Sequence, residues 1–473
     1  MKESHITRLI TGNDKPSRRT IISAALLLAW PAIVEQVMLT AVQYVDTAMV
    51  GRLGAGATAA VGLTTTPTWM MMGIFAATAM GFSVQVAQNL GAERRDEAKR
   101  IVAQSLRVVA VLGVLIGSLG VAVSFRLPYW MGAEEEIVGP AGLYFRIMAC
   151  GMPLTFGVQM ISSMFRCSGD TKSPMILNTM INLINVVLNF LFIYPTRSMT
   201  LFGADFTMPG LGLGVMGAAV ASVTSTGTIF VIFLWMLFDR ESPVKLSKDV
   251  DGTLDKKCLS TAFRLGLPIA MERLAMNGAQ VMQTAIITEI GTASLAAHHL
   301  AVTAESISYA PAFGVSQAAT AMTGQAIGAG RKDLAMYFAK VSIAMGMILM
   351  TIGGIILFAF AEPLIRIFST DPEVIAMGGA VLRIVAFAEP LFGASIVSSG
   401  SLRGAGDSRF PFLISMSTMW GLRITLSLFL AGRMGLMGVW LAMAFELIVR
   451  GCIFLTRIFR GKWTEAGLFK EKV

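Results

Sequence analysis

Charged residues are scarce in this chain of 473 residues. Asp, Glu, Lys and Arg make up 14% of it and apolar residues 55%, whereas a soluble domain is about 25% charged. The shortage excludes a soluble enzyme, a disordered protein and a nucleic-acid-binding domain. It is concentrated in five charge-free stretches, namely 53–92, 173–196, 206–238, 306–330 and 341–361. Each is long enough to cross a bilayer core, which takes about 20 apolar residues. We therefore expect an integral membrane protein.

Cysteine is also rare, and several familiar motifs are missing. The four cysteines fit neither a zinc site nor a CxxC redox pair, so we interpret them as packing residues; they are Cys150, Cys167, Cys258 and Cys452. The first twenty residues lack the apolar core of a signal peptide, so the first apolar run is expected to be a retained transmembrane helix. No dinucleotide fingerprint, Walker motif, HExxH or nucleophile elbow occurs in a credible setting. We expect no cofactor, no ATP hydrolysis and no enzymatic activity.

The hydropathy pattern predicts twelve transmembrane helices. Their ranges are 22–48, 58–88, 98–125, 138–163, 174–196, 214–238, 260–288, 295–327, 336–361, 376–401, 410–431 and 436–458. An even number places both termini on one side of the membrane. Of the 38 Lys and Arg residues, 29 fall on that side, five fall in the opposite loops and four lie within the spans. The positive-inside rule therefore places both termini in the cytoplasm, and the net charge of +9 is mostly an orientation signal.

The chain contains an internal repeat at an offset of 237 residues. Thr47, Gly54 and Leu63 fall on Thr284, Gly291 and Leu300, and the turn FRCSGDTKSP falls on LRGAGDSRFP. Each unit holds six spans, so the two units are parallel repeats, an arrangement typical of transporters with a site between two bundles. The predicted organisation is an N-terminal segment (1–20), an N-lobe (21–238), a cytoplasmic linker (239–257), a C-lobe (258–460) and a cytoplasmic tail (461–473).

Acidic residues inside the spans are the first candidates for function, since a charge at membrane depth is costly and usually faces the bundle interior. They are Glu35, Asp46, Glu272, Glu305, Glu389 and Glu446. Asp46 aligns with Gln283, so this acid exists in one unit only, as a single coupling site would require. A solvated carboxylate at a helix end is the alternative for Asp46. Glu35 and Glu272 are equivalent in the repeat, which fits a shared structural role as well as a functional one.

An asparagine stripe marks the fifth span. Asn178, Asn182, Asn185 and Asn189 recur every three or four residues and so share one helical face. This face is expected to meet other helices or water, because asparagine is costly against lipid. Such a stripe often only holds helices together. With Asp46 in the same unit, however, it also provides oxygen ligands for a proton or a sodium-like ion.

These motifs together resemble the multidrug and toxic compound extrusion (MATE) family, in its NorM/DinF-like prokaryotic branch. The similarity covers VDTAMVGRLG, the two Gly-Asp turns, NVVLNFLFIYP and LGVMGAAVAS, and extends over almost the whole chain. The resemblance implies a monomeric antiporter with two six-helix lobes in the plasma (inner) membrane. Such a protein expels cationic amphipathic drugs or toxic metabolites by alternating access, in exchange for protons or sodium.

The resemblance also assigns candidate site residues. Asp46 matches the coupling aspartate of the family's first helix, Asn185 and Asn189 match the fifth-helix pair beside it, and Ser222 matches a Ser/Thr position on the sixth helix. Glu35 is added as a nearby acid. A second cation site in the C-lobe would draw on Glu272, Glu305 and Glu389. However, Glu272 and Glu389 each lie about one turn from the family's positions, which favours proton coupling through Asp46.

Two rival functions are a lipid-linked sugar flippase and a membrane-embedded enzyme. A lipid-linked sugar flippase of the same superfamily would favour a basic cavity, whereas these spans hold six acids against four arginines. A membrane-embedded enzyme would need paired catalytic acids or a histidine cluster at membrane depth. The sequence therefore favours cation-coupled export.

Overall fold

The computed structural model describes residue 10 and residues 17–201, 204–239, 243–246 and 253–469. Most of the predicted N-terminal segment (1–20), part of the linker (239–257) and the last four residues of the tail (461–473) lie outside the described residues. The described residues of the chain are helical almost throughout. The exception is an antiparallel two-stranded sheet, β1 (Pro195–Leu201) and β2 (Ala204–Leu211).

The helices follow the two predicted units. The long helices of the first unit are α2 (Arg18–Gly51), α3 (Ala55–Gly91), α4 (Arg95–Val123), α6 (Glu135–Cys167), α7 (Lys172–Phe192) and α8 (Gly214–Asp239). The second unit has α9 (Lys256–Ile290), α10 (Thr292–Gly328), α11 (Lys332–Ala359), α13 (Pro372–Ala386), α14 (Glu389–Ala405), α15 (Arg409–Met416) and α16 (Thr425–Phe459). Short elements are α5 (Leu127–Trp130), α12 (Ala361–Arg366), the π-helix η1 (Ser417–Ile424) and the 3-10 helix η2 (Lys462–Glu465).

This architecture suits a membrane, because a helix satisfies its own backbone hydrogen bonds where water is missing. Among the described residues, eight helical segments are long and apolar enough to cross, and the bent pair α13–α14 makes a ninth. The segment Arg409–Phe459, 51 residues long, covers two predicted spans and is broken at Gly435, where φ is 57°. The helices α9 and α10, with 35 and 37 residues, are long enough but too polar for this set. The twelve-helix prediction is therefore confirmed, with two of the twelve more polar than expected.

The repeat is visible in the helix boundaries. The helices α3 and α10 have 37 residues each and begin and end 237 positions apart. The units then diverge. The unbroken α6 corresponds to α13 and α14, which bend by 59°, and α7 corresponds to α15 followed by η1. A π-helical stretch within an α-helix often lies at a functional site.

Each unit lends the start of its first helix to the other. The first turns of α2, including Ala25 and Leu28, are buried with Val315 and Ala319 in the core of the second unit. Conversely, Cys258 and Ala262 at the start of α9 are buried in the core of the first unit. The two units are thus interlocked by a symmetric exchange.

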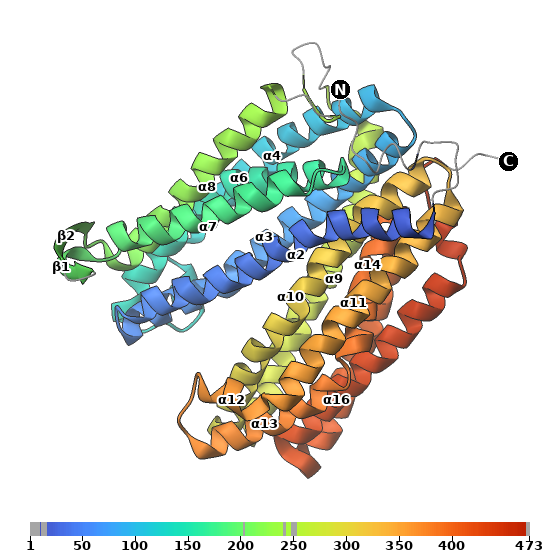
Figure 1. Ribbon diagram of the computed structural model, residues 1–473. Coiled ribbons are helices and arrows are strands. Elements are labelled where there is room, and N and C mark those ends of the chain that lie inside the picture. Colours follow the sequence, from blue (N-terminus) through green and yellow to red (C-terminus); the bar gives the residue numbers. More distant parts are fainter. Residues whose placement is uncertain (1–9, 11–16, 202–203, 240–242, 247–252, 470–473) are drawn as a thin grey trace.

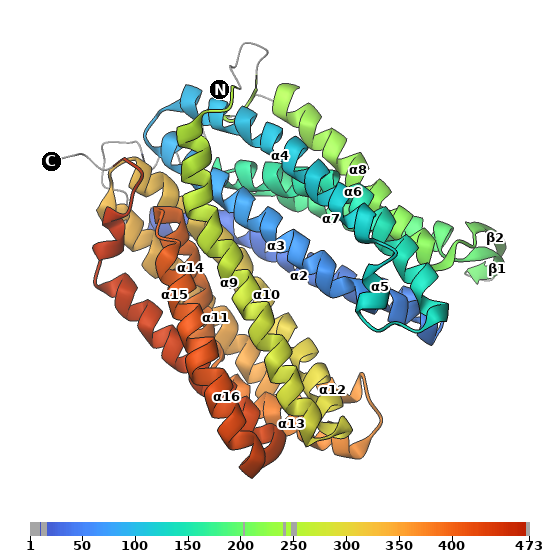
Figure 2. The ribbon, with the colours of Figure 1, turned by 180° about the vertical axis from the view of Figure 1, so that it is seen from behind.

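The two lobes form a V. They converge at the end of the molecule near the termini and diverge toward β1, β2 and α12 at the opposite end (Figure 1, and from behind in Figure 2). Along the junction, α2 and α3 of the first lobe pack against α9 and α10 of the second. We refer to the two ends as the termini end and the open end.

Candidate functional site

A polar cluster in the first lobe joins three helices. Asp46 of α2 accepts a hydrogen bond at Oδ1 from Asn189 Nδ2 of α7 at 2.8 Å. Asn189 Nδ2 also donates to Asn185 Oδ1 at 3.0 Å, and Asn185 contacts Ser222 Oγ of α8 at 3.0 Å. Asn185 and Asn189 are buried, whereas Asp46 is half-buried. Asp46 and three of the residues predicted around it, Asn185, Asn189 and Ser222, therefore form one hydrogen-bonded cluster.

The Asn185 amide has two orientations with different consequences. If its nitrogen and oxygen are exchanged, the nitrogen donates to Asp46 Oδ1 at 2.9 Å and the oxygen accepts from Ser222 Oγ at 3.0 Å. This orientation satisfies both ends of the amide and gives Asp46 a second donor. Among the described residues, no Lys or Arg forms an ion pair with Asp46. Neutral amide donors therefore hold this carboxylate.

Glu35 is not part of this cluster. It is buried on α2, where Oε1 pairs with Arg166 Nη1 of α6 at 2.8 Å and accepts from Asn178 Nδ2 of α7 at 2.7 Å. The asparagine stripe is thus divided. Asn178 donates a hydrogen bond to Glu35, whereas Asn185 and Asn189 lie in the Asp46 cluster.

Glu272 repeats the Glu35 arrangement in the second lobe. Its Oε2 pairs with Arg403 Nη2 of α14 at 2.7 Å, and its Oε1 accepts from Ser415 Oγ of α15 at 3.0 Å. Glutamate, arginine and the polar partner are all displaced by 237 positions from those of Glu35. Equal contacts at equivalent positions favour a structural role for both glutamates, each tying the first helix of its lobe to that lobe.

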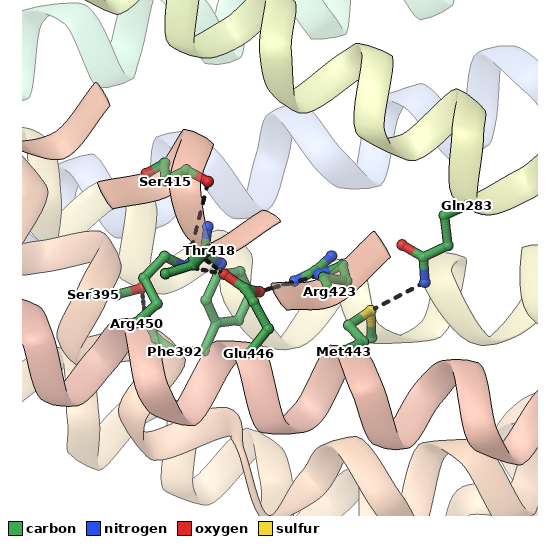
Figure 3. Close-up of polar contacts among 9 residues, drawn as sticks. All are labelled: Gln283, Phe392, Ser395, Ser415, Thr418, Arg423, Met443, Glu446 and Arg450. Carbon is green, nitrogen blue, oxygen red and sulfur yellow. Dashed lines mark hydrogen bonds and ion pairs between the residues drawn. The ribbon is translucent and has the colours of Figure 1, made fainter. Parts of the chain in front are cut away.

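The position of Asp46 carries a different chemistry in the second lobe. Gln283 stands there, and its nearest polar contact is the sulfur of Met443 on α16, with Nε2 at 4.0 Å from Sδ (Figure 3). Met443 is the repeat counterpart of Ser222, at the offset of 221 that holds for the last span. The asparagine pair is replaced by Leu422 and Leu426. The second lobe therefore has no ionisable version of the Asp46 cluster.

A buried ionic group lies in the second lobe instead. Glu446 of α16 pairs with Arg423 of η1 at 2.6 Å and with Arg450 at 3.3 Å, and it accepts from Thr418 Oγ1 at 2.6 Å (Figure 3). All three charged side chains are at most 8% exposed. Sequence reasoning identified Glu446 but neither arginine as its partner, although the spacing of four residues between Glu446 and Arg450 is a signal for such a pair.

The other two acids of the predicted C-lobe cation site lie apart from Glu272. Glu389, at the start of α14, is fully buried and accepts from Ser308 Oγ at 2.7 Å. Glu305 is buried one turn before Ser308 on α10. Within the part of the chain that the structure describes, no group of three or more His, Cys, Asp or Glu residues is arranged to hold a metal ion. The structure therefore brings together Asp46, Asn185, Asn189 and Ser222 of the predicted N-lobe site, but neither Glu35 nor the C-lobe trio joins a common cluster.

One contact links the Asp46 helix directly to the other lobe. Tyr44 lies two residues before Asp46, and its hydroxyl is 2.9 Å from the carbonyl oxygen of Thr303 and 2.7 Å from Ser306 Oγ, both on α10. This contact joins α2 near Asp46 to α10 of the second lobe. No sequence motif indicated this tyrosine, because its partners lie about 260 residues away.

Comparison with known proteins gives matches over the whole molecule. The family model MatE matches twice, at residues 31–191 and 268–429. A probable multidrug resistance protein NorM from Thermotoga maritima is 29% identical over 452 residues, 94% of each chain. The multidrug resistance protein MdtK of Yersinia pestis is 24% identical over 442 residues, 92% of this chain and 94% of its own.

Solved structures with the same fold are also found. One, the outward-facing conformation of a multidrug resistance MATE family transporter of the MOP superfamily, has a TM-score of 0.86 at 22% identity. It covers 98% of this chain and 100% of its own. A MOP superfamily transporter from Pyrococcus furiosus has a TM-score of 0.87 at 21% identity, over 98% of this chain and 99% of its own. The two-lobe architecture is thus a known one.

Proposed function

The chain belongs to the MatE family and is a membrane transporter rather than an enzyme, and from this premise we propose that it is a cation-coupled antiporter. Its relatives named as multidrug resistance proteins support drug extrusion. The proposed cargo is organic cations, other amphipathic drugs and toxic metabolites, moved by alternating access. The observation that carries the coupling is Asp46, a half-buried carboxylate held by amide donors in one lobe only.

A proton is the proposed coupling ion. In the ionised state, Asp46 accepts hydrogen bonds from the α7 amides, which ties α2 to α7. A protonated Asp46 has fewer acceptor sites and one donor, so the attraction between α2 and α7 weakens. A proton shifts the balance between two conformations only by its different affinity for each. The Asp46 cluster provides such a difference if it is intact in one conformation and rearranged in the other.

The membrane orientation follows from the charge distribution. The excess of Lys and Arg on the side of the termini supports a cytoplasmic termini end in the plasma membrane of a prokaryote. The open end of the V then faces outward (Figure 1). Because one chain supplies both lobes, we propose that a monomer is the transporting unit, with lobe boundaries at 21–238 and 258–460.

Reconstituted vesicles test this proposal with the variant Asp46→Asn. Efflux of a fluorescent organic cation is measured under a proton gradient alone and then under a sodium gradient alone. We expect proton-driven efflux from the natural protein and only background efflux from Asp46→Asn. The matched control is Gln283→Asn at the equivalent position of the second lobe, which should retain efflux.

Two outcomes would overturn parts of the proposal. Undiminished proton-driven efflux by Asp46→Asn would remove Asp46 from the coupling mechanism. Efflux driven by sodium but not by protons would show that sodium is the coupling ion. The buried acids of the second lobe would then be the candidate site.

A further inference from the structure

A pair of reciprocal hydrogen bonds closes the seam between the lobes at the termini end. Gln88 of α3 donates from Nε2 to the carbonyl oxygen of Gly404 at 3.0 Å. Gln325 of α10 donates from Nε2 to the carbonyl oxygen of Cys167 at 2.6 Å. Donors and acceptors are both related by the repeat offset of 237. The seam is therefore closed by the same bond made twice, once in each direction.

Glycine makes this close approach possible. A Cβ atom at Gly91 would collide with the carbonyl oxygen of Gln325, and one at Gly328 would collide with that of Gln88. These glycines are again equivalent in the repeat. The two backbones are therefore in close contact at these two points of the seam.

The segment after α16 begins on the second lobe. Trp463 in η2 is fully buried in the core of that lobe, and its Nε1 donates to the carbonyl oxygen of Ile458 at 3.1 Å. Ala466 then passes beside Gly406 at the end of α14. This part of the tail is anchored to the lobe that precedes it in sequence.

The same segment ends on the first lobe. The backbone N–H of Leu468 donates to Gln88 Oε1 at 2.9 Å, and the ring of Phe469 lies 4.5 Å from the guanidinium carbon of Arg94. A single amide, that of Gln88, thus binds the second lobe through its nitrogen and the tail through its oxygen. The tail crosses the seam at the point where the two lobes are already joined.

We propose that residues 463–469 form a strap across the termini end, which must leave α3 before the lobes can separate there. The inference rests on the proposed alternating access, in which this end opens to the cytoplasm. The strap adds a hydrogen bond and a cation–π contact between the lobes, so its removal should favour the state open at the termini end. A net hydrogen bond changes such an equilibrium about fivefold and an exposed cation–π contact about two- to fivefold, so the two together correspond to about ten- to thirtyfold.

Cys167 is a natural reporter of the seam. It is buried between the lobes with Ala87 of α3 and Ala321 of α10. The test uses a protein in which Cys150, Cys258 and Cys452 are replaced by alanine. The rate at which a membrane-impermeant maleimide labels Cys167 is measured in inside-out vesicles, where the termini end faces the reagent. This readout does not depend on ion coupling, so it separates failure of the strap from failure of the proposed antiport.

Two pairs of variants provide matched comparisons. A chain that ends at Glu465 lacks the crossing segment, whereas one that ends at Phe469 keeps every described contact of the strap. Leu468→Pro removes the N–H donor, whereas Leu468→Ala keeps it. We expect labelling about ten- to thirtyfold faster in the chain that ends at Glu465, which loses both contacts, and about fivefold faster in Leu468→Pro, which loses the hydrogen bond. The second members should match the parent protein.

The outcomes distinguish the proposal from its alternatives. Equal labelling rates for the chains ending at Glu465 and Phe469 would overturn the strap. So would equal rates for Leu468→Pro and Leu468→Ala in protein of unchanged melting temperature. Faster labelling in both first members supports the strap even if dye efflux is found to be driven by sodium.

Discussion

The two lobes share a frame but differ in where they hold charge. At equivalent positions, Glu35 and Glu272 form the same ion pairs with Arg166 and Arg403. The lobes differ further along the same helices, where Asp46 faces asparagine amides while its counterpart Gln283 faces a methionine sulfur. The ion pairs that both lobes share are therefore best explained by a structural role. What only one lobe has is the better candidate for function.

The second lobe also holds charged residues that have no counterpart in the first lobe. They form the Glu446 group, namely Glu446, Arg423 and Arg450. This group differs from the Asp46 cluster because two arginines neutralise the carboxylate and all are buried. A buried carboxylate is costly to separate from the arginines that neutralise it, whereas a half-buried carboxylate held by amides has no such counter-charge to lose. We therefore expect the Glu446 group to stabilise the lobe, and Asp46 to titrate during transport.

The largest expected effect comes from breaking the Glu446 group. Glu446→Ala leaves Arg423 and Arg450 buried without a counter-charge, which should lower the free energy of unfolding by about 3–5 kcal/mol. The measurement is the melting temperature of purified protein in detergent. Ser225→Ala, at the counterpart position of the first lobe, should cost less than about 1.5 kcal/mol. A Glu446→Ala protein as stable as the parent would mean that the group carries no structural role.

The second prediction concerns the paired glutamates. Glu35→Gln and Glu272→Gln each remove one ion pair while keeping the shape of the side chain. Each should destabilise the protein by about 2–3 kcal/mol, because a charge-assisted bond of a partly buried arginine is lost. The two melting temperatures should fall together. A loss of transport for only one of the two variants, at equal stability, would show that the repeat-equivalent pairs do different work.

The smallest expected effect is on transport alone. Asn189→Leu installs the residue type that the second lobe carries at the equivalent position 426. Asp46 then loses one donor worth about 1.5 kcal/mol, so proton-driven efflux should fall about tenfold with little change in melting temperature. Efflux from vesicles is compared with that of Leu426→Ala, which should be unaffected. If both variants transported equally well, the amide pair would not contribute to coupling.

The sequence predicted the parts of the site that depend on local periodicity. Helix spacing places the four asparagines on one face of α7, and the resemblance to the MATE family placed Asn185 and Asn189 beside Asp46. The repeat offset likewise matches the boundaries of α3 and α10 to the residue. The asparagine face and the matching helix boundaries need only helical geometry and an internal alignment, whereas the contact between α2 and α7 depends on tertiary packing.

The remaining features depend on tertiary packing. The π-helical stretch η1 changes the register of Arg423, so its approach to Glu446 does not follow from a regular α-helical pattern. The bend of 59° between α13 and α14 has no counterpart in α6. Because of it, Glu389 and the rest of α14 do not continue the line of α13 as they would in a straight helix. The path of residues 463–469 could not be predicted either, because the sequence WTEAGLF has no periodicity that indicates its partner.

The exchange of helix starts between the lobes has a consequence for biosynthesis. Among the described residues, the first turns of α2 are buried in a core built mainly by helices of the second lobe, including α10 and α11. The ribosome makes α2 several hundred residues before those helices, so α2 enters the bilayer with its inner face uncovered. The first half of the chain is therefore an incomplete folding unit, and its apolar helix start must be shielded by lipid or the insertion machinery until synthesis is nearly finished.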